Sequence, residues 1–484
     1  MRVSMRFAVA VLIVTVSMSS LALGVTGPVA AESPQRFLLL GGAGLPANLE
    51  MLVASIGGTL IYEFGEIGVA VAESSEPAFV YAAQSLPGIQ AVVPDALASV
   101  GIEAAAGTIS GEGAFEETLS GEAASGEVTF AAPVLHSSQW NLRAIRAREA
   151  WTTTGILGAG AVVAVVDSGI DASHPAFGLA PAGQVFAPPF SRSFVSEFAD
   201  PNDAVMDKAE HGTHIAGIIA ARAGTVGVAP RAKLVSIKVL KWNALARRAE
   251  GRESDILAAI LYAANLMTPD GPVDIINISA GFTFTVNGRE IAQQLAALNR
   301  AINYAHQKGI VVVTSIGNGG SNLNLNANEV KAPAEIPHVV AASATGPLTL
   351  GNTPLSGPDT FASFSDYGRA VYVAAPGGNV LVQGRQLLNN PMADWVPGPC
   401  SRQSAVHASC ATSLPILSMA GTSQAAAHVS GVAALIVSRF GGTASAETVR
   451  AFLKASAVDL GKPGRDPQYG FGRIDALRAV TVSP

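Results

Sequence analysis

The sequence contains little cysteine, little charge and few aromatic residues. Its 484 residues include two cysteines, and aspartate, glutamate, lysine and arginine together make up 14% of them. Two cysteines without partner histidines or further cysteines do not form a zinc site. The sequence has no stripe of basic residues interleaved with aromatic ones, which argues against nucleic-acid binding. Because 49% of the residues are hydrophobic, we expect a globular chain with one large domain and an additional part.

Apolar runs long enough to cross a membrane are also missing. Residues 7–18 form an apolar run that follows two arginines and precedes small residues up to Ala31. The run is too short to span a bilayer and is typical of a secretory signal peptide, which we expect over residues 1–31. Cleavage after Gly24 is an alternative, and an amphipathic first helix is a weaker one because no polar residue interrupts the first part of the run. We therefore expect a secreted or periplasmic protein without a stable membrane anchor.

Basic residues are missing from one long segment. No lysine or arginine occurs between residues 37 and 142, so residues 33–142 have a net charge of about −11, against about +4 for residues 143–484. Opposite net charges favour association of the two parts.

Residues 35–95, called the front unit below, show the pattern of a small α+β domain. Short apolar strands alternate with two helices in the order β-α-β-β-α-β, which predicts a ferredoxin-like unit. The expected strands are residues 36–40, 59–63, 68–72 and 88–93, and the expected helices are residues 46–55 and 76–84. The following segment is rich in glycine, alanine, serine and glutamate, which predicts an acidic flexible linker over residues 96–135.

The remaining residues, 136–484, alternate between strand-like and helix-like patterns. The strands are short, β-branched and apolar on both faces, as in a parallel sheet that is covered by helices on both sides. We therefore predict a doubly wound α/β domain with its functional edge at the carboxyl ends of the strands. The expected strands are residues 161–166, 232–240, 273–279, 309–317 and 338–344, and the expected helices include residues 211–222, 254–267 and 290–309.

The two cysteines, Cys400 and Cys410, lie ten residues apart in a loop-like segment. Since an exported protein meets an oxidising compartment, we expect a local disulfide. Two unpaired thiols are the alternative, because sequence does not give their separation in space.

Three polar residues stand at the start of a loop or helix. Asp167 follows the apolar run "AVVAVV", His211 opens "HGTHIAGIIA", and Ser423 lies in "GTSQAAAHVSG" at the start of a long helical pattern. Each alone has an ordinary structural explanation as a turn or cap residue. Together they are the nucleophile, the base and the carboxylate that acyl transfer needs. An α/β-hydrolase would have a different order of the three, and no G-x-S-x-G frames Ser423.

These motifs resemble those of the subtilisin-like serine peptidases, the subtilase family. "VVDSGIDASHP", "HGTHIAG" and "GTSQAAAHVSG" are similar to that family's Asp, His and Ser motifs in their order, and the likeness extends over about residues 136–480. The resemblance implies an endopeptidase whose catalytic residues are Asp167, His211 and Ser423. It also implies that Asn318, in "SIGNGGS", shares the oxyanion hole with the nucleophile's N–H.

The resemblance further assigns a substrate-binding segment and a pocket. Ser279, Ala280 and Gly281 match the backbone segment that pairs with an extended substrate. Ala280 is smaller than the usual apolar residue there, so the pocket beside it is expected to be wider or rearranged. Lys331 falls near the position that closes the pocket floor, where a lysine would favour acidic side chains or would extend to solvent instead.

The resemblance also concerns the front unit and ligands. Residues 32–95 are expected to be a propeptide that assists folding and inhibits the peptidase until a cut before Trp140, one option being near His136. No cofactor is expected for the chemistry. A structural calcium ion is one option for the loop that contains Asp200, Asn202, Asp203 and Asp207, and a solvated loop is the other.

The expected partners are protein or peptide substrates and the chain's own propeptide, and we expect a monomer. Two rival classes remain to be compared. A catalytically silent binding module would keep the fold but would typically lack one of the three catalytic residues, and none is missing here. A nucleotide-binding α/β protein would need a glycine fingerprint that "VVDSGIDASHP" does not contain.

Overall fold

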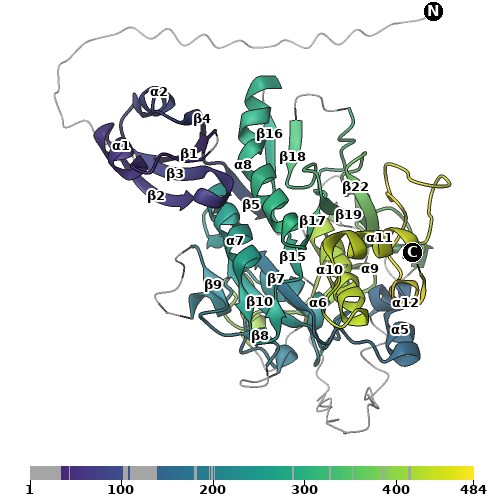
Figure 1. Cartoon of the computed structure of the whole chain (residues 1–484). Helices are drawn as coiled ribbons and strands as arrows, with labels where there is room; N and C mark the ends of the chain where they lie inside the picture. The colour runs from purple at the N-terminus through teal and green to yellow at the C-terminus, as the bar shows by residue number, and fades with distance from the viewer. Residues whose placement is uncertain are drawn as a thin grey trace, which may run out of the picture.

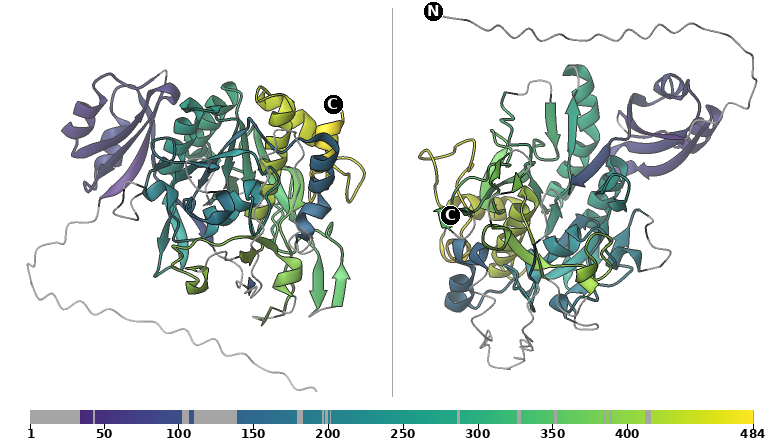
Figure 2. Two further views of the ribbon diagram at one scale, coloured as in Figure 1. Left: turned by 90° about the horizontal axis from the view of Figure 1, so that it is seen from below. Right: turned by 180° about the vertical axis from the view of Figure 1, so that it is seen from behind.

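The computed structural model describes residues 34–483 with gaps: residues 43, 102–106, 110–138, 179–182, 196, 198–199, 201, 286–287, 326–328, 351–352, 384–385, 388–389 and 412–415 are not described. The expected signal peptide and the expected cut near His136 therefore lie outside the described residues. A small front unit packs against one side of a large α/β part, and the C-terminal helices lie on the opposite side (Figures 1 and 2).

The front unit has the predicted α+β architecture. Its four strands form an antiparallel sheet in the order β2-β3-β1-β4, and two helices cover one face. Alternate residues of the first strand explain this arrangement: Phe37 and Leu39 pack with the unit's own helices, while Leu38 and Leu40 join the core of the large part. The elements are β1 (Gln35–Gly41), α1 (Leu49–Ser55), β2 (Gly58–Phe64), β3 (Val69–Ser74), α2 (Phe79–Gln84) and β4 (Ile89–Pro94).

The large part is built on a parallel sheet, as predicted. Its order is β22-β19-β17-β15-β7-β10-β8, with β9 beside β10, and every pairing between these strands is parallel. The strands are β7 (Val162–Asp167), β8 (Val185–Phe186), β9 (Arg192–Ser193), β10 (Lys233–Lys238), β15 (Ile275–Ile278), β17 (Val311–Ser315), β19 (Val339–Thr345) and β22 (Val371–Pro376). All five predicted strands are present. The edge strand β22 was not predicted, because two alanines and a proline end its strand-like pattern after three residues.

Helices cover both faces of this sheet (Figure 1). Along β7, Val163 and Val165 pack with helices α6 and α10, while Val162, Ala164 and Val166 pack with α7 and α8. The order in which strands are added to the sheet reverses at β7, since β10 lies on one side of it and β15 on the other. Such a switch point opens a crevice at the carboxyl ends of the strands. The helices are α4 (Trp140–Ala144), α5 (Ala147–Thr154), α6 (His211–Ala220), α7 (Glu253–Asn265), α8 (Gly288–Gln307), α9 (Pro391–Asp394), α10 (Thr422–Arg439), α11 (Ala446–Ser456) and α12 (Ala476–Thr481).

Short strands complete the described part of the chain. They include β11 (Lys241–Asn243), β12 (Arg248–Arg252), β13 (Met267–Thr268), β14 (Gly271–Pro272), β16 (Phe282–Thr285), β18 (Glu329–Ala332), β20 (Leu348–Leu350), β21 (Thr353–Ser356), β23 (Val382–Gln383), β24 (Gln386–Leu387), β25 (Val396–Pro399) and β26 (Ile416–Met419). Within the described residues, no helix is both long and apolar enough to cross a bilayer.

The predicted flexible linker is wrong where the structure describes it. Residues 97–101 form strand β5, which pairs antiparallel with β12, and residues 107–109 form strand β6, which pairs with β26. Glycine, alanine and serine have little intrinsic strand preference, so composition alone predicts a linker. Here the strands arise because two exposed edges of the large part offer them backbone partners.

The front unit binds the large part through α7 and α8. The Arg300 guanidinium on α8 donates to the backbone carbonyls of Gly41, Ile67 and Gly68 at 3.0, 3.1 and 3.0 Å. Asp95 accepts from the Ser254 backbone N–H at 2.9 Å in the first turn of α7, and from its hydroxyl at 2.7 Å. These contacts differ from the expected attraction of an acidic surface to a basic one, because all three of these acceptors of Arg300 are neutral backbone carbonyls.

Two ion pairs cross the same interface among the described residues. Arg36 lies 3.8 Å from Asp255, and Arg252 lies 3.9 Å from Asp95. The base belongs to the front unit in the first pair and to the large part in the second. The net charge of each part therefore does not describe how the two surfaces match.

Candidate active site

The crevice at the switch point brings together the residues that the sequence analysis singled out. Asp167 is the last residue of β7, and Ser279 and Asn318 follow the neighbouring strands β15 and β17. His211 and Ser423 lie in the first turns of α6 and α10, which pack on the same face of the sheet. Because parallel strands end at one edge and the helices begin there, residues far apart in sequence meet at one place.

His211 and Asp167 form a buried pair. The imidazole Nδ1 lies 2.8 Å from Asp167 Oδ1 and 2.9 Å from Oδ2, and the Ser168 N–H donates to Oδ1 at 2.7 Å. His211 is 5% exposed, whereas Asp167 is completely buried. Burial of His211 opposes its charged form, but the charge and hydrogen bond of Asp167 outweigh this and raise the pKa of His211 above its ordinary value. Asp167 thus fixes Nδ1 as the protonated nitrogen and leaves Nε2 to accept a proton.

The close approach of α6 to the end of β7 depends on a glycine. A Cβ atom on Gly212 would lie 2.1 Å from the Gly169 carbonyl oxygen. Only glycine fits this contact between the helix and the turn after Asp167. The glycine that follows His211 in "HGTH" is therefore required for steric reasons.

Asp207 accepts hydrogen bonds from residues at the start of α6. These contacts decide whether its carboxylate is available to the expected calcium ion. Its carboxylate accepts hydrogen bonds from the Ser168 hydroxyl, from the backbone N–H groups of Ala209, Glu210 and Thr213, and from the Thr213 hydroxyl, at 2.7–3.0 Å. Burial raises the pKa of Asp207 to about 6, against the lowering effect of these donors. Protein donors thus already satisfy this carboxylate.

The other loop residues behave in the same way. Asp203 accepts from the Ser193 hydroxyl at 2.8 Å and lies 3.2 Å from the Lys238 ammonium, and Asp200 accepts from the Asn202 N–H at 2.7 Å. Within the described residues, these four do not gather as a group of metal ligands. Asp203 and Asp207 are buried and are held by protein groups, so the solvated loop does not describe these two residues.

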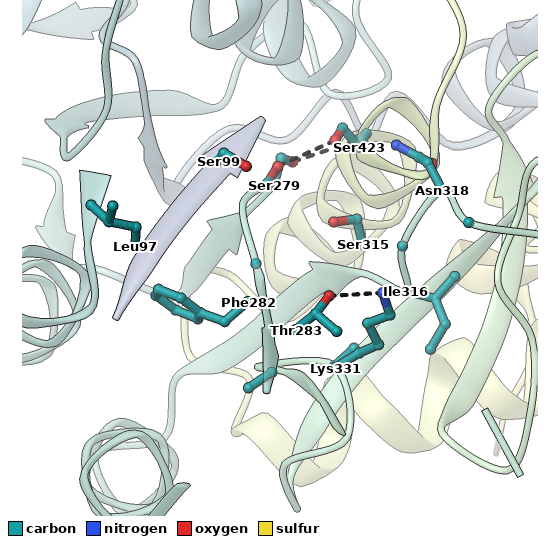
Figure 3. A pocket seen from close by; sticks show the side chains of 15 residues that line it. Leu97, Ser99, Ser279, Phe282, Thr283, Ser315, Ile316, Asn318, Lys331 and Ser423 are labelled. Carbon is teal, nitrogen blue, oxygen red and sulfur yellow. Dashed lines mark hydrogen bonds between the residues drawn. The ribbon is translucent and has the colours of Figure 1, made fainter. Parts of the chain in front are cut away.

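Ser423 is the second residue of α10, and its hydroxyl lies in the crevice. The residue is 5% exposed, and Oγ donates to the Ser279 carbonyl at 3.2 Å (Figure 3). In this state the hydroxyl is directed at the Ser279 carbonyl. The surrounding residues of α10 are small and buried, which allows the N-terminus of the helix to lie directly against the end of the sheet.

Asn318 is oriented by the residue before Ser423. Its side-chain oxygen accepts from the Thr422 backbone N–H at 2.9 Å and from the Thr422 hydroxyl at 2.8 Å. The amide nitrogen therefore points the other way, and Figure 3 shows it directed toward Ser423. An amide held in this way can donate to an oxygen that develops negative charge beside Ser423.

A cavity of about 440 Å³ lies beside Ser423 and is lined mainly by polar groups. Gly281 and Asn318 are among its walls, and Lys331 and Thr283 line its lower end (Figure 3). The Lys331 ammonium donates to the Thr283 hydroxyl at 2.8 Å, and Ala280 is buried but does not line the cavity. Lys331 is the one charged residue among the described residues that line the cavity.

Sequence reasoning missed one occupant of the crevice. Ser99 of β5 forms an antiparallel β-bridge with Gly281, and Leu97 and Ser99 both line the cavity. β5 thus lies between β12 and the segment 279–281, with a backbone partner on each side. No side-chain pattern of residues 97–101 indicates this, because the contacts are made by the backbone.

The expected disulfide is present, since Cys400 and Cys410 are bonded to each other with Cα atoms 5.6 Å apart.

The large part is a doubly wound parallel sheet, and Asp167, His211 and Ser423 lie at the end of its strand β7 and in the first turns of α6 and α10, as expected for a subtilisin-like fold. The model of the subtilase family matches residues 158–472, more than half of the chain, and the chain therefore belongs to that family. It is similar to the thermophilic serine proteinase of Bacillus sp. (strain AK1), at 31% identity over 66% of this chain and 62% of that protein. It is also similar to thermitase of Thermoactinomyces vulgaris, at 29% identity over 72% of this chain and 98% of thermitase.

The chain spans about three fifths of the Bacillus proteinase and 42% of another relative, the minor extracellular protease Epr of Bacillus subtilis. Among solved structures it resembles the epidermin leader peptide processing serine protease EpiP from Staphylococcus aureus, with a TM-score of 0.68 and 19% identity over 93% of this chain and 99% of that one. This likeness concerns the fold alone. A lanthipeptide protease has a TM-score of 0.56 and 27% identity over 72% of this chain and 94% of that one.

Proposed function

We propose that this protein is a secreted serine endopeptidase, made as a zymogen that processes itself. The observation that carries the proposal is the grouping of Ser423, the Asp167–His211 pair and the Asn318 amide at one edge of the sheet, beside a cavity. A catalytically silent binding module of the same fold is the alternative. It would have no need for a buried carboxylate that fixes the protonated nitrogen of a histidine.

The proposed reaction begins when Ser423 Oγ attacks the carbonyl carbon of the peptide bond and His211 Nε2 takes its proton. Asp167 stabilises the imidazolium that forms. The carbonyl oxygen becomes an oxyanion that accepts from the Asn318 amide and the Ser423 N–H. The C–N bond then breaks, His211 returns the proton to the leaving amine, and an ester on Ser423 remains. Water attacks this ester with His211 again as base, which releases the acid and restores the hydroxyl.

The zymogen part of the proposal is supported by β5. The bridge between Ser99 and Gly281 is antiparallel, so continuing its register by two residues sets Gly101 opposite Ser279, the residue that accepts from Ser423. We propose that the bond after Gly101 is the one presented to Ser423, rather than a bond near His136. Before and after this cut, residues 35–101 would block the crevice as an inhibitor.

The same register explains why the cavity beside Ser423 is not filled by the chain's own segment. The residue opposite Ser279 is the one whose side chain would enter the cavity, and glycine has none. Lys331 at its lower end supports a preference for substrates with an acidic residue at that position, because an ammonium beside the cavity favours carboxylates.

Export and a monomeric state complete the proposal. The apolar run at residues 7–18 and the bonded cysteines both suit a protein that reaches an oxidising compartment. The activity is tested with internally quenched peptides and a serine-directed active-site label, on the wild type and Ser423→Ala. The proposal expects hydrolysis and labelling only in the wild type. A folded wild type that neither hydrolyses peptides nor takes the label would favour the binding module.

A further inference from the structure

Glu210, the residue directly before His211, has an unusual environment. Its backbone lies in the left-handed region at φ +68°, which is uncommon for a residue other than glycine. Its side chain is nevertheless completely buried. A strained backbone and a buried carboxyl both cost free energy, so other contacts must offset them.

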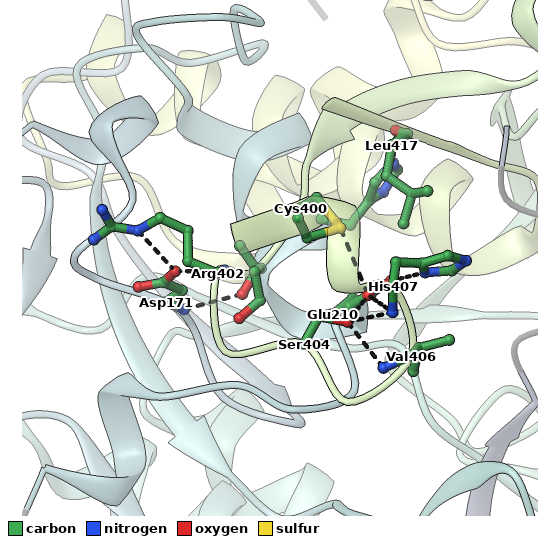
Figure 4. Close-up of a disulfide and its surroundings, with 12 residues drawn as sticks. Asp171, Glu210, Cys400, Arg402, Ser404, Val406, His407 and Leu417 are labelled. Carbon is green, nitrogen blue, oxygen red and sulfur yellow. Dashed lines mark hydrogen bonds and ion pairs between the residues drawn. A yellow bond between two sulfur atoms is a disulfide. The ribbon is translucent and has the colours of Figure 1, made fainter. Parts of the chain in front are cut away.

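Those contacts come from the segment closed by the disulfide, residues 400–410, called the disulfide loop below. His407 Nδ1 lies 2.7 Å from Glu210 Oε2, and the His407 backbone N–H donates to Oε1 at 3.1 Å. The Ser404 hydroxyl donates to Oε1 as well, and the bonded sulfur of Cys410 lies 3.7 Å away (Figure 4).

The protonation of this cluster fits its burial. Burial, followed by the nearby charge of Asp207, raises the pKa of Glu210 to about 8, and burial lowers the pKa of His407. Both directions favour the neutral forms of the two groups, in which the Glu210 carboxyl donates a hydrogen bond to His407 Nδ1. The cluster has no net charge, and glutamine is then a close structural substitute for Glu210.

The disulfide loop also contacts the segment that follows Asp167 and the segment that precedes His211. The Arg402 N–H donates to Asp171 Oδ2 at 2.8 Å, in the turn that follows Asp167. The Ala405 N–H donates to the Lys208 carbonyl at 2.9 Å, in the turn that precedes His211. One loop thus hydrogen-bonds to the turn after Asp167 and to the turn before His211, and so links the positions of the carboxylate and the base.

We propose that Glu210 is a positioning residue for His211. Its hydrogen bonds to Ser404 and His407 of the disulfide loop fix the left-handed turn from which helix α6 begins. The direction of the imidazole depends on that turn, since His211 is the first residue of α6. A displacement of about 1 Å at a catalytic group can lower a rate about 100-fold. This inference rests on the proposed peptidase activity.

The test compares three substitutions at Glu210 and its partner in the full-length, self-processed enzyme. Glu210→Gly suits the left-handed backbone but removes the hydrogen bonds to Ser404 and His407. We expect kcat per labelled active site to fall about 10- to 100-fold with KM within about 2-fold. Glu210→Gln keeps an acceptor for Ser404 and a donor for His407, and we expect kcat within about 3-fold of the wild type. His407→Ala added to Glu210→Gly should cause little further loss, because both act through one contact.

A control separates positioning from stability. Arg146 is another left-handed residue, at φ +54°, whose side chain lies 2.6 Å from the buried Asp475, and neither of these residues lines the cavity beside Ser423. Arg146→Gly should lower Tm but leave kcat unchanged. If Glu210→Gly behaves in the same way, or keeps the wild-type kcat, the proposal is overturned.

A readout that does not need activity distinguishes this failure from failure of the peptidase proposal. The proton on His211 Nδ1, which is hydrogen-bonded to Asp167, should give a low-field proton NMR signal in Ser423→Ala. We expect Glu210→Gly to shift or broaden this signal and Glu210→Gln to preserve it. An unchanged signal in Glu210→Gly contradicts the positioning role even if no peptide is hydrolysed, whereas an inactive wild type with the expected signal changes contradicts only the peptidase proposal.

Discussion

Ser99 pairs with Gly281 in an antiparallel bridge. The segment after the front unit therefore lies beside residues 279–281, whose Ser279 carbonyl accepts the hydrogen bond of the Ser423 hydroxyl. The front unit is therefore more than a neighbour of the large part. It is anchored on α7 and α8 by Arg300 and Asp95, and it extends its chain as strand β5 into the crevice. The proposed inhibitory segment and the proposed catalytic residues are thus in direct contact through β5.

The role of Asp167 predicts a large effect of a nearly isosteric change. Asp167→Asn keeps the shape of the side chain but allows its amide to donate to His211, which would favour the wrong protonated nitrogen. We expect kcat to fall about 10⁴-fold with little change in KM. The measurement is steady-state hydrolysis of a quenched peptide, with circular dichroism as the control for folding. A loss of less than about tenfold would be incompatible with the proposed role.

Asn318 is predicted to act mainly in the transition state. Asn318→Ala removes the amide donor, and we expect kcat to fall about 10²- to 10³-fold while KM changes little. The substitution also removes the acceptor for Thr422, so Tm should fall as well. Thr422→Val is the matched control, because it removes the side-chain contact to Asn318 but leaves the amide donor. Equal losses of kcat in the two variants would point to a structural role instead.

The interface of the front unit predicts that its release depends on pH. Burial raises the pKa of Glu253 to about 8, and the nearby Asp95 adds to this; burial also raises the pKa of Asp255 to about 6. Arg36 and Arg252 oppose the shift at Asp255, and Gln294 donates to Glu253.

The sign of this dependence follows from proton uptake. A carboxyl whose pKa is higher in the complex than after release makes the complex bind more protons. The complex is therefore tightest below the ordinary carboxyl pKa, and it weakens as the pH rises through the range up to about 8, by up to tenfold for each pH unit for one such group. Size-exclusion chromatography of the cut enzyme across this range measures the fraction of front unit that stays bound. Glu253→Gln should flatten the profile, and tighter binding at higher pH would contradict the account.

Lys331 is predicted to select the residue that enters the cavity. Lys331→Glu should reverse the preference between peptides with glutamate and with lysine before the cut bond, with kcat/KM changing about 10- to 100-fold in each direction. Thr283→Val serves as a control, since it removes the contact of the ammonium but not its charge. Unchanged ratios of kcat/KM in Lys331→Glu would mean that the ammonium extends to solvent when substrate is bound.

The sequence was most informative where one strong local pattern decides the structure. Continuous β-branched runs predicted β7 and its parallel neighbours, and the polar residues after those runs then had to lie at one edge of the sheet. Asp167, Ser279 and Asn318 are therefore close for reasons that the sequence contains. Their distances to one another, and the direction of the Ser423 hydroxyl, depend on packing that no local pattern specifies.

The features that the sequence did not predict share a different cause. β5 has the composition of a linker and becomes a strand only because β12 and Gly281 offer backbone partners. Glu210 and His407 lie 197 residues apart, and nothing in either segment indicates the contact. Long-range pairing of backbone groups and of single side chains has no periodicity, so it emerges only from the folded chain.

The most direct test of the account is the fate of the full-length chain as wild type and as Ser423→Ala, followed by intact mass and N-terminal sequencing. The account predicts that the wild type is cut after Gly101, giving a new N-terminus at Ile102, and that folded Ser423→Ala stays whole. A wild-type cut elsewhere, such as near His136, would contradict the register of β5. Cutting in both chains, or in neither, would contradict the central claim that Ser423 is the nucleophile for the chain's own processing.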